Sequence, residues 1–289
     1  MPAIGRLDSR FFLRGGRFQR GSLRSQRKLI AVHRTRKSNF MTKLRFVAGA
    51  VLVLCFCPCL MISAAESNHL IVSKISTQSG GHRIRIDKYA TSRSGKHPVI
   101  LVLHGAGGTL LDGPEMRRVA CQLAEAGNTV YLVHYFNRTG TIFGFDSGMQ
   151  KNFAVWLTTV RDCIKFAQQD NADPLPVGIY GYSLGGFLAL SAASDNPAVG
   201  AIVEQAGGIW NGKAELIKHM PPVLIVHGEG DRRVPFQKYA QPLAGVLRKR
   251  GATFKTRFFP EEGHVFAAFA MSRVRDDAVE FFRQHLGRK

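Results

Sequence analysis

The chain of 289 residues predicts an α/β fold with a mostly parallel, eight-stranded sheet and helices on both of its faces. From residue 99 onward, short apolar runs alternate with amphipathic helical patterns, which is typical of parallel strands joined by helices. Val99–Leu103 and Val223–Val226 are apolar at every position, as strands covered on both faces require. Two runs with a period of two at the front predict an antiparallel hairpin at one edge of the sheet.

The same apolar periods give the bounds that we expect for each element. Strands are predicted at Leu70–Ser76, Arg83–Tyr89, Val99–His104, Thr129–Tyr135, Val177–Tyr182, Ala201–Gln205, Val223–His227 and Phe254–Phe259. Helices are predicted at Pro114–Ala126, Phe153–Gln169, Leu184–Ala193, Phe236–Arg250 and Ala267–Leu286, with a short one at Lys213–His219. Residues 66–289 are therefore expected to form one domain.

The positive charge of the chain is concentrated near its N-terminus. Residues 1–45 hold 13 of the 40 Lys and Arg residues but only one of the 20 acidic residues, Asp8, so the remainder carries a net charge of +8. A basic, removable segment indicates targeting and not a binding face on the folded domain. We therefore expect no nucleic-acid partner.

The segment after this basic region has the pattern of a signal peptide. Phe46–Ile62 contains no charged residue and is followed by Ser63-Ala64-Ala65, a small-residue cleavage site. We expect Met41 to be the true start of the translated protein. Residues 1–65 would comprise a basic extension and the signal peptide, and we expect cleavage after Ala65. The mature chain would then be periplasmic or extracellular. Retention of residues 46–62 as a membrane anchor is the alternative.

Two cysteines remain after such a cleavage, because Cys55, Cys57 and Cys59 lie within the apolar segment. Cys121 and Cys163 fall on helices that should cover opposite faces of the sheet. Although an exported protein can form disulfides, this placement predicts two free thiols.

The segment Val177–Gly186 predicts a nucleophilic serine. An apolar strand ends in the pattern G-x-S-x-G, with Ser183 at its centre, and leads directly into a helix of small residues. This is the sequence form of a sharp strand–turn–helix elbow, in which glycines leave room for the tight turn. The serine hydroxyl would stand at the helix N-terminus, where N–H groups can receive developing negative charge.

Two later strand ends supply the partners that a serine nucleophile needs. Asp231 follows the seventh strand and His264 follows the eighth, so the chain order is nucleophile, acid, base. His264 would take the proton of Ser183, and Asp231 would hold the imidazole in the correct tautomer. Asp231 could instead be only a helix cap, and Glu229 is an alternative acid. The oxyanion hole would consist of the N–H of Leu184 and one from Ala106 or Gly107.

Together, these motifs resemble the dienelactone hydrolase family of the α/β-hydrolase superfamily. The resemblance is carried by His-Gly-Ala-Gly-Gly at 104–108, Gly-Tyr-Ser-Leu-Gly-Gly at 181–186, His-Gly-Glu-Gly-Asp-Arg-Arg-Val-Pro at 227–235 and Glu-Gly-His-Val-Phe at 262–266, and it covers about residues 70–287. It implies an α/β-hydrolase fold and places the nucleophile, acid and base at Ser183, Asp231 and His264. The namesake enzymes carry cysteine where this chain has Ser183, which favours a general ester hydrolase.

The candidate substrate contacts are His134, Tyr135, Tyr182 and Glu204, because each lies at a strand end. Only residues 206–222 separate the sixth and seventh strands, which leaves no room for a sizeable lid domain. We therefore expect an open site for small or polar esters.

Three other functions compete with a secreted serine esterase. They are a dienelactone-type lactone hydrolase, a peptidase, and an inactive binding protein on a hydrolase scaffold. The sequence contains neither H-E-x-x-H nor a phosphate-binding G-x-x-x-x-G-K-[ST] pattern, so we expect no metal and no cofactor.

Overall fold

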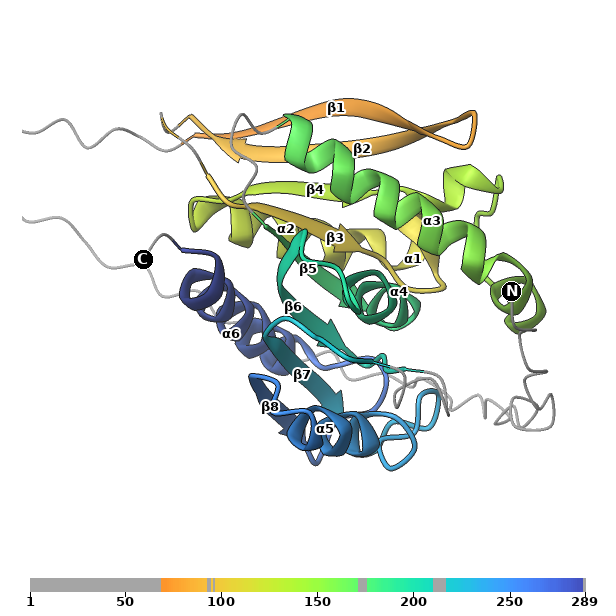
Figure 1. The fold of residues 1–289 in the computed structure, drawn as a ribbon, viewed down its shortest axis with the longest axis vertical. Coiled ribbons are helices and arrows are strands. Elements are labelled where there is room, and N and C mark those ends of the chain that lie inside the picture. Colours follow the sequence, from red (N-terminus) through yellow and green to blue (C-terminus); the bar gives the residue numbers. More distant parts are fainter. Residues whose placement is uncertain (1–68, 93–94, 96, 171–175, 210–216, 288–289) are drawn as a thin grey trace, which may run out of the picture. The chain divides into compact units, whose positions relative to one another are not determined.

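The computed structural model describes residues 69–92, 95, 97–170, 176–209 and 217–287, so the predicted signal region lies outside the described residues. These residues form a single eight-stranded sheet in the order β1-β2-β4-β3-β5-β6-β7-β8 (Figure 1). Within the described part of the chain, no helix is long and apolar enough to span a membrane.

The sheet is parallel from β4 to β8 and antiparallel at one edge. β1 pairs antiparallel with β2 and β2 pairs antiparallel with β4, which confirms the predicted hairpin. The strands are β1 (Leu70–Ser79), β2 (His82–Thr91), β3 (Val99–Leu103), β4 (Thr129–Val133), β5 (Val177–Tyr182), β6 (Val199–Gln205), β7 (Val223–Gly228) and β8 (Phe254–Phe259).

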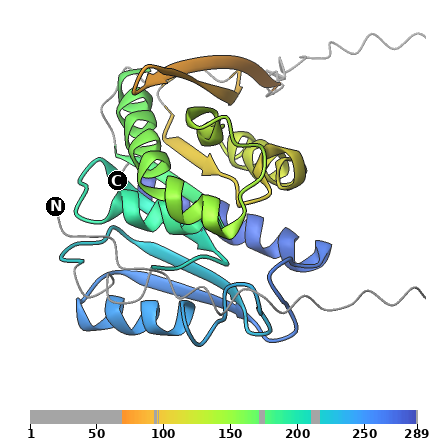
Figure 2. The same ribbon diagram turned by 90° about the vertical axis from the view of Figure 1, so that its right-hand side faces the viewer.

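Helices cover both faces of the sheet, as the all-apolar strands require. They are α1 (Gly108–Leu111), α2 (Gly113–Glu125), the 3-10 helix η2 (Tyr135–Arg138), α3 (Asp146–Asp170), α4 (Leu184–Ala193), α5 (Ala240–Lys249) and α6 (Ala268–Leu286). In Figure 2, α2 and α6 lie on one side of the strands and α3, α4 and α5 lie on the other.

The core is divided by the sheet into two apolar layers. Alternate residues of β3 enter different layers: Leu101 and Leu103 pack with α3 and α4, whereas Ile100 and Val102 pack with α2 and α6. Cys121 on α2 and Cys163 on α3 belong to opposite layers and are free thiols, as the sequence predicts. The α/β fold class is confirmed.

Some element bounds differ from the prediction for physical reasons. α5 begins at Ala240 and not at the predicted Phe236. The reason is Pro242, which has no N–H and is tolerated only in the first turn of a helix. The predicted short helix at 213–219 lies partly outside the described residues, and Ile217–His219 are not helical. Conversely, α3 starts seven residues before its predicted start, at Asp146, and this extension supports part of the site described below.

Candidate active site

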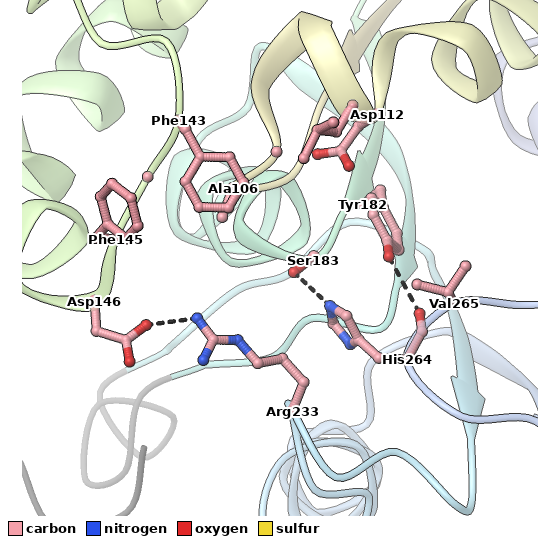
Figure 3. A pocket seen from close by; sticks show the side chains of 13 residues that line it. Ala106, Asp112, Phe143, Phe145, Asp146, Tyr182, Ser183, Arg233, His264 and Val265 are labelled. Carbon is pink, nitrogen blue, oxygen red and sulfur yellow. Dashed lines mark hydrogen bonds and ion pairs between the residues drawn. The ribbon is translucent and has the colours of Figure 1, made fainter. Parts of the chain in front are cut away.

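Ser183, Asp231 and His264 meet at the carboxyl edge of the sheet. Ser183 joins β5 to α4, Asp231 follows β7, and His264 follows β8. His264 Nε2 lies 2.9 Å from the Ser183 hydroxyl (Figure 3). His264 Nδ1 lies 2.7 Å from Asp231 Oδ2. One imidazole thus contacts both the nucleophile and the acid at hydrogen-bonding distance.

The backbone at Ser183 is held in a rare conformation by its glycine neighbours. Its φ of 53° and ψ of −116° lie outside the regions that L-residues ordinarily occupy. A Cβ atom at Gly181 would lie 2.3 Å from the carbonyl oxygen of Gly185, and one at Gly185 would lie 2.3 Å from that of Leu103. The elbow therefore needs glycine at both positions to keep this strained serine in place.

Asp231 is fixed by backbone groups as well as by histidines. Its Oδ1 accepts the N–H groups of Arg233 and Val234, each at 2.8 Å, while Oδ2 faces His264. Burial alone would raise the pKa of Asp231, but hydrogen bonds from His227 and His264 outweigh it and hold the pKa well below the usual carboxyl range. The acid is thus ionised and immobile, and it serves as a turn cap and an imidazole partner at once.

Glu229, the alternative acid, is exposed on the turn after β7. Its main-chain N–H donates to the carbonyl of Phe259 at 3.0 Å, and this bond ties the turn to β8. The carboxylate that meets His264 is that of Asp231.

The predicted oxyanion donors lie beside the nucleophile. Leu184 is the first residue of α4, so its N–H belongs to the turn in which helical N–H groups have no partner within the helix. Ala106 and Gly107 line the cavity in front of Ser183. The carbonyl of Ala106 accepts the N–H of Gly144 at 2.8 Å, which anchors residues 104–107, the oxyanion loop, to the segment before α3.

His104 and Tyr135 support the oxyanion loop from below. Their rings stack with centroids 4.2 Å apart, and the Tyr135 hydroxyl donates to the main-chain carbonyl of His104 at 2.7 Å. Burial lowers the pKa of His104 to about 4, so this ring is neutral near pH 7. Both residues position the loop and do not themselves line the catalytic cavity.

The four predicted substrate contacts lie in different places. Tyr182 lines the catalytic cavity, and its hydroxyl donates to the main-chain carbonyl of His264 at 3.2 Å. Tyr135 lies under the oxyanion loop, His134 lies at the junction of β2 and β4, and Glu204 is fully buried. Among the described residues, these three are absent from the wall of the catalytic cavity, because their side chains enter packed regions behind the strand ends.

Glu204 is a buried carboxyl close to the triad but not part of it. Its Oε2 accepts the N–H of Gly207 at 2.9 Å, within the turn that follows β6. Burial raises its pKa to about 7, although the nearby His227 acts in the opposite direction. Glu204 therefore changes its charge near neutral pH.

The catalytic cavity has a volume of about 490 Å³ and a largely apolar wall. Leu111, Phe143, Phe145 and Val265 line it, and all four side chains are largely exposed, from 40% for Phe143 to 79% for Val265. Sequence reasoning missed these residues because they lie on loops without periodicity. The feature of the sequence that could have drawn attention to this loop is the pair of phenylalanines on either side of Gly144.

Charged side chains also line this cavity. Arg233 and Asp146 form an ion pair at 2.5 Å across it, as Figure 3 shows. Asp112 lies on the other side, with one carboxylate oxygen that finds no hydrogen-bond partner among the described residues. Burial is the main reason that the pKa of Asp112 is raised. The motif at 227–235 contains Arg233 but gave it no role, and no sequence motif marked Asp112 or Asp146.

The described residues contain no group of three or more His, Cys, Asp or Glu that could hold a metal ion. An imidazole between a hydroxyl and a carboxylate can remove the hydroxyl proton and return it to another atom.

A model of the dienelactone hydrolase family matches residues 86–284. The chain belongs to the dienelactone hydrolase family. This membership confirms the resemblance seen in the motifs, and it makes the protein a hydrolase.

Known relatives agree with this assignment. A protein of Methylorubrum extorquens named for a carboxymethylenebutenolidase activity is 24% identical over 224 residues, covering 71% of this chain and 75% of the relative. The crystal structure of a dienelactone hydrolase from Anabaena variabilis is similar with a TM-score of 0.60 and 22% identity, covering 75% of this chain and 99% of that one. An acylaminoacyl peptidase of Pyrococcus horikoshii is similar with a TM-score of 0.62 and 17% identity, covering 76% of this chain but 42% of that one.

Proposed function

We propose that this hydrolase cleaves carboxylic esters through an acyl-enzyme formed on Ser183. The observation that carries the proposal is the position of His264, which lies 2.9 Å from the Ser183 hydroxyl and 2.7 Å from the Asp231 carboxylate. A serine hydroxyl is a weak nucleophile until a base within hydrogen-bonding reach accepts its proton. The fixed, ionised Asp231 orients that base and stabilises it once it is protonated.

In the first half of the reaction, Ser183 Oγ attacks the ester carbonyl carbon while His264 Nε2 takes the hydroxyl proton. The N–H of Leu184 and one from Ala106 or Gly107 would stabilise the oxyanion of the tetrahedral intermediate. The C–O bond to the alcohol then breaks, and His264 returns the proton to the departing oxygen. An acyl group remains on Ser183.

In the second half, water attacks the acyl-enzyme and His264 takes one of its protons. The bond between the acyl carbon and Ser183 Oγ breaks, and the proton returns to the serine. The carboxylic acid leaves and the resting enzyme is restored.

Three alternatives compete with this proposal: a lactone hydrolase and a peptidase, which would cleave a different bond, and a binding protein, which would cleave none. A lactone would use the same steps, with the leaving oxygen still attached to the acyl group. The peptidase with a similar fold is matched over less than half of its length, so the likeness does not extend to its whole chain. A binding protein would not need the strained serine backbone or the ionised acid.

The proposal is tested by the hydrolysis of phenyl acetate by the purified full-length protein and by its Ser183→Ala variant. We expect the variant to lose activity by a factor of about 10³ or more, because removal of a triad nucleophile has effects of this size or larger. Equal rates for the two proteins would rule out Ser183 as the nucleophile and would favour the binding-protein alternative.

We also propose that the enzyme is exported. The support is the uncharged segment 46–62 between a basic region and the small residues Ser63-Ala64-Ala65. Mass determination of the protein recovered from the exported fraction should give an N-terminus at Glu66. A protein that stays in the membrane fraction with residues 46–62 attached would favour the anchor instead.

A further inference from the structure

Two additional cavities adjoin the catalytic cavity on opposite sides of Ser183. The larger has a volume of about 740 Å³ and shares Leu111, Asp112, Tyr182 and Val265 with the catalytic cavity. The smaller has a volume of about 40 Å³ and shares Ser183 itself, with Ala106 and Arg233. An ester bound at Ser183 therefore has, beyond the catalytic cavity itself, a large additional space on one side and a very small one on the other.

The position of His264 decides which side receives the alcohol. Because the protonated imidazole must return its proton to the departing oxygen, the alcohol part of the ester lies on the His264 side. Val265 and Phe266 follow His264 directly and line the larger cavity. The ring of Tyr182, which also lines it, has its centroid 5.6 Å from that of His264. The larger cavity is thus on the side of the leaving group.

The smaller cavity lies on the side of the acyl group. It is lined by Leu184, which follows the nucleophile and carries a predicted oxyanion donor, and by Met149, Phe187 and Tyr239. His264 itself lines neither of the two additional cavities among the described residues, so the assignment rests on its neighbours Val265 and Phe266, which line the larger cavity and not the smaller one. Three of these four side chains are large, and they close the space behind Ser183.

The two volumes set very different size limits. A cavity of roughly 150 Å³ holds a benzene ring, so a space of about 40 Å³ holds an acyl tail of one or two carbons beyond the carbonyl. The larger cavity, at about 740 Å³, holds several rings or a branched alkyl group.

The chemistry of the larger cavity favours an apolar alcohol. Near the triad its wall is formed by the apolar Leu111, Val265 and Phe266 together with Asp112 and Tyr182, followed by Met116 and Met271. Most of the surface that a ligand would meet beside the leaving oxygen is therefore aliphatic or aromatic.

The charged groups of the larger cavity are Glu115, Arg118 and Arg275, together with Asp112 where this cavity meets the catalytic cavity. Arg275 contacts Glu115 at 2.5 Å and donates to Gln122 at 3.0 Å, and Arg118 contacts Glu115 at 2.8 Å. Two guanidinium groups therefore share one carboxylate, while one carboxylate oxygen of Asp112 has no hydrogen-bond partner among the described residues. An alcohol in this cavity meets a mainly apolar wall, and its polar groups, if it has any, would lie against these side chains.

We propose that this hydrolase is specific for esters of short acyl groups, acetate above all, with bulky and mainly apolar alcohols or phenols. This inference rests on the acyl-enzyme mechanism proposed above. It agrees with the expectation of a small acyl group, but it replaces the expectation of a small or polar alcohol, which followed from the missing lid and not from the cavity walls.

The direct test compares two isomeric esters, 4-butylphenyl acetate and phenyl hexanoate. They contain the same atoms, but the four extra carbons lie on the alcohol in the first and on the acyl group in the second. Each methylene that a pocket cannot accommodate changes the selectivity by roughly tenfold or more. We expect kcat/KM of the full-length enzyme to be at least about tenfold higher for 4-butylphenyl acetate. Equal values, or a preference for phenyl hexanoate, would overturn the proposal.

A first pair of variants tests the acyl side. Met149→Ala should enlarge the smaller cavity and raise the ratio of kcat/KM for phenyl hexanoate to that for phenyl acetate by about threefold or more. Met220→Ala is the matched control, because Met220 lines a different cavity, away from the triad. A ratio that is unchanged in Met149→Ala, or raised equally in both variants, would contradict the assignment.

A second pair tests the alcohol side. Ala268→Phe places a ring in the larger cavity, from an exposed position on the first turn of α6. It should lower the ratio of kcat/KM for 4-butylphenyl acetate to that for phenyl acetate by about threefold or more. Ser272→Phe, at another exposed position of the same helix, is the control and should leave this ratio unchanged.

These outcomes separate the two proposals. If Ser183→Ala and the wild type hydrolyse phenyl acetate at the same rate, the acyl-enzyme mechanism fails. If Ser183→Ala is inactive but the isomeric esters react equally well, the mechanism stands and the assignment of the cavities fails.

Discussion

Among the described residues, the histidine–aspartate pairs His264–Asp231 and His134–Asp87 both lie at strand ends, and they differ in what the second ring nitrogen meets. His264 faces Asp231 at 2.7 Å and the Ser183 hydroxyl at 2.9 Å. His134 faces Asp87 at 3.0 Å, but its other nitrogen lies 3.5 Å from the guanidinium of Arg85. A permanent cation at that position opposes protonation of the ring.

The surroundings of the two carboxylates differ as well. The Asp231 side chain is completely shielded from solvent and accepts two backbone N–H groups, whereas the Asp87 side chain is 19% exposed. Burial, followed by the nearby arginines, lowers the pKa of His134, and its hydrogen bond to Asp87 only partly opposes this. A histidine–aspartate pair therefore becomes a candidate base only where a nucleophile occupies the remaining nitrogen.

The largest expected effect comes from removing one histidine of each pair. His264→Gln should lower kcat for phenyl acetate by a factor of about 10³ or more, because the proton acceptor is lost. His134→Gln should stay within about threefold of the wild type. Steady-state kinetics of both variants checks this contrast, and similar losses in the two would remove the distinction between the pairs.

The next effect concerns the two carboxylates. Asp231→Asn should lower kcat by about 10²- to 10⁴-fold, because an amide can hold the imidazole in the wrong tautomer. Asp87→Asn makes the same chemical change in the other pair and should have almost no effect on kcat. If Asp231→Asn retained wild-type kcat, its carboxylate would be only the turn cap that the sequence left as an alternative.

These contrasts also show how far the sequence could lead. The chain order of Ser183, Asp231 and His264 and the glycines of the elbow were readable, because local turn geometry demands particular residue types. His134 was predicted as a substrate contact because it lies at a strand end, and only the pairing of β2 with β4 shows that it meets Asp87 and Arg85 instead.

The cavity walls could not be predicted for a related reason. Asp146 and Arg233 are 87 residues apart, and their contact exists only after α3 and the turn beyond β7 are packed. Phe143 and Phe145 lie in a loop without periodicity, so no pattern assigned them to the site. Local signals give strands, elbows and chain order, whereas the shape of a cavity depends on tertiary packing.

Glu204, a fully buried carboxyl near Asp231, extends the comparison to protein stability. The pKa of Glu204 is raised to about 7 by burial, so the folded protein loses stability as the pH rises from the ordinary carboxyl pKa through 7. At pH 8 the free energy of unfolding of Glu204→Gln should exceed that of the wild type by on the order of 2–3 kcal/mol. At pH 4.5 the two proteins should differ little. Urea denaturation at both pH values measures this. A wild type that is more stable at pH 8 than the variant would mean that the ionised carboxylate is needed by the fold.

The smallest expected effect is on the stability contributed by His134. Because its pKa is lowered, the unfolded chain takes up a proton before the folded one does, and the wild type loses stability as the pH falls below the ordinary histidine value. His134→Gln should flatten this part of the pH profile and change the free energy of unfolding by about 1 kcal/mol at pH 8. Thermal or urea unfolding between pH 5 and 8 checks it, and an unchanged profile would assign the pH dependence to other groups.

The most direct test of the central claim is to trap the nucleophile with diisopropyl fluorophosphate. The serine oxygen forms a bond to phosphorus, fluoride leaves, and peptide mass mapping locates the adduct. We expect one adduct, on Ser183, that is absent from Ser183→Ala and forms far more slowly in His264→Gln, but at the normal rate in His134→Gln. An adduct on a different residue, or equal labelling of Ser183→Ala, would contradict it.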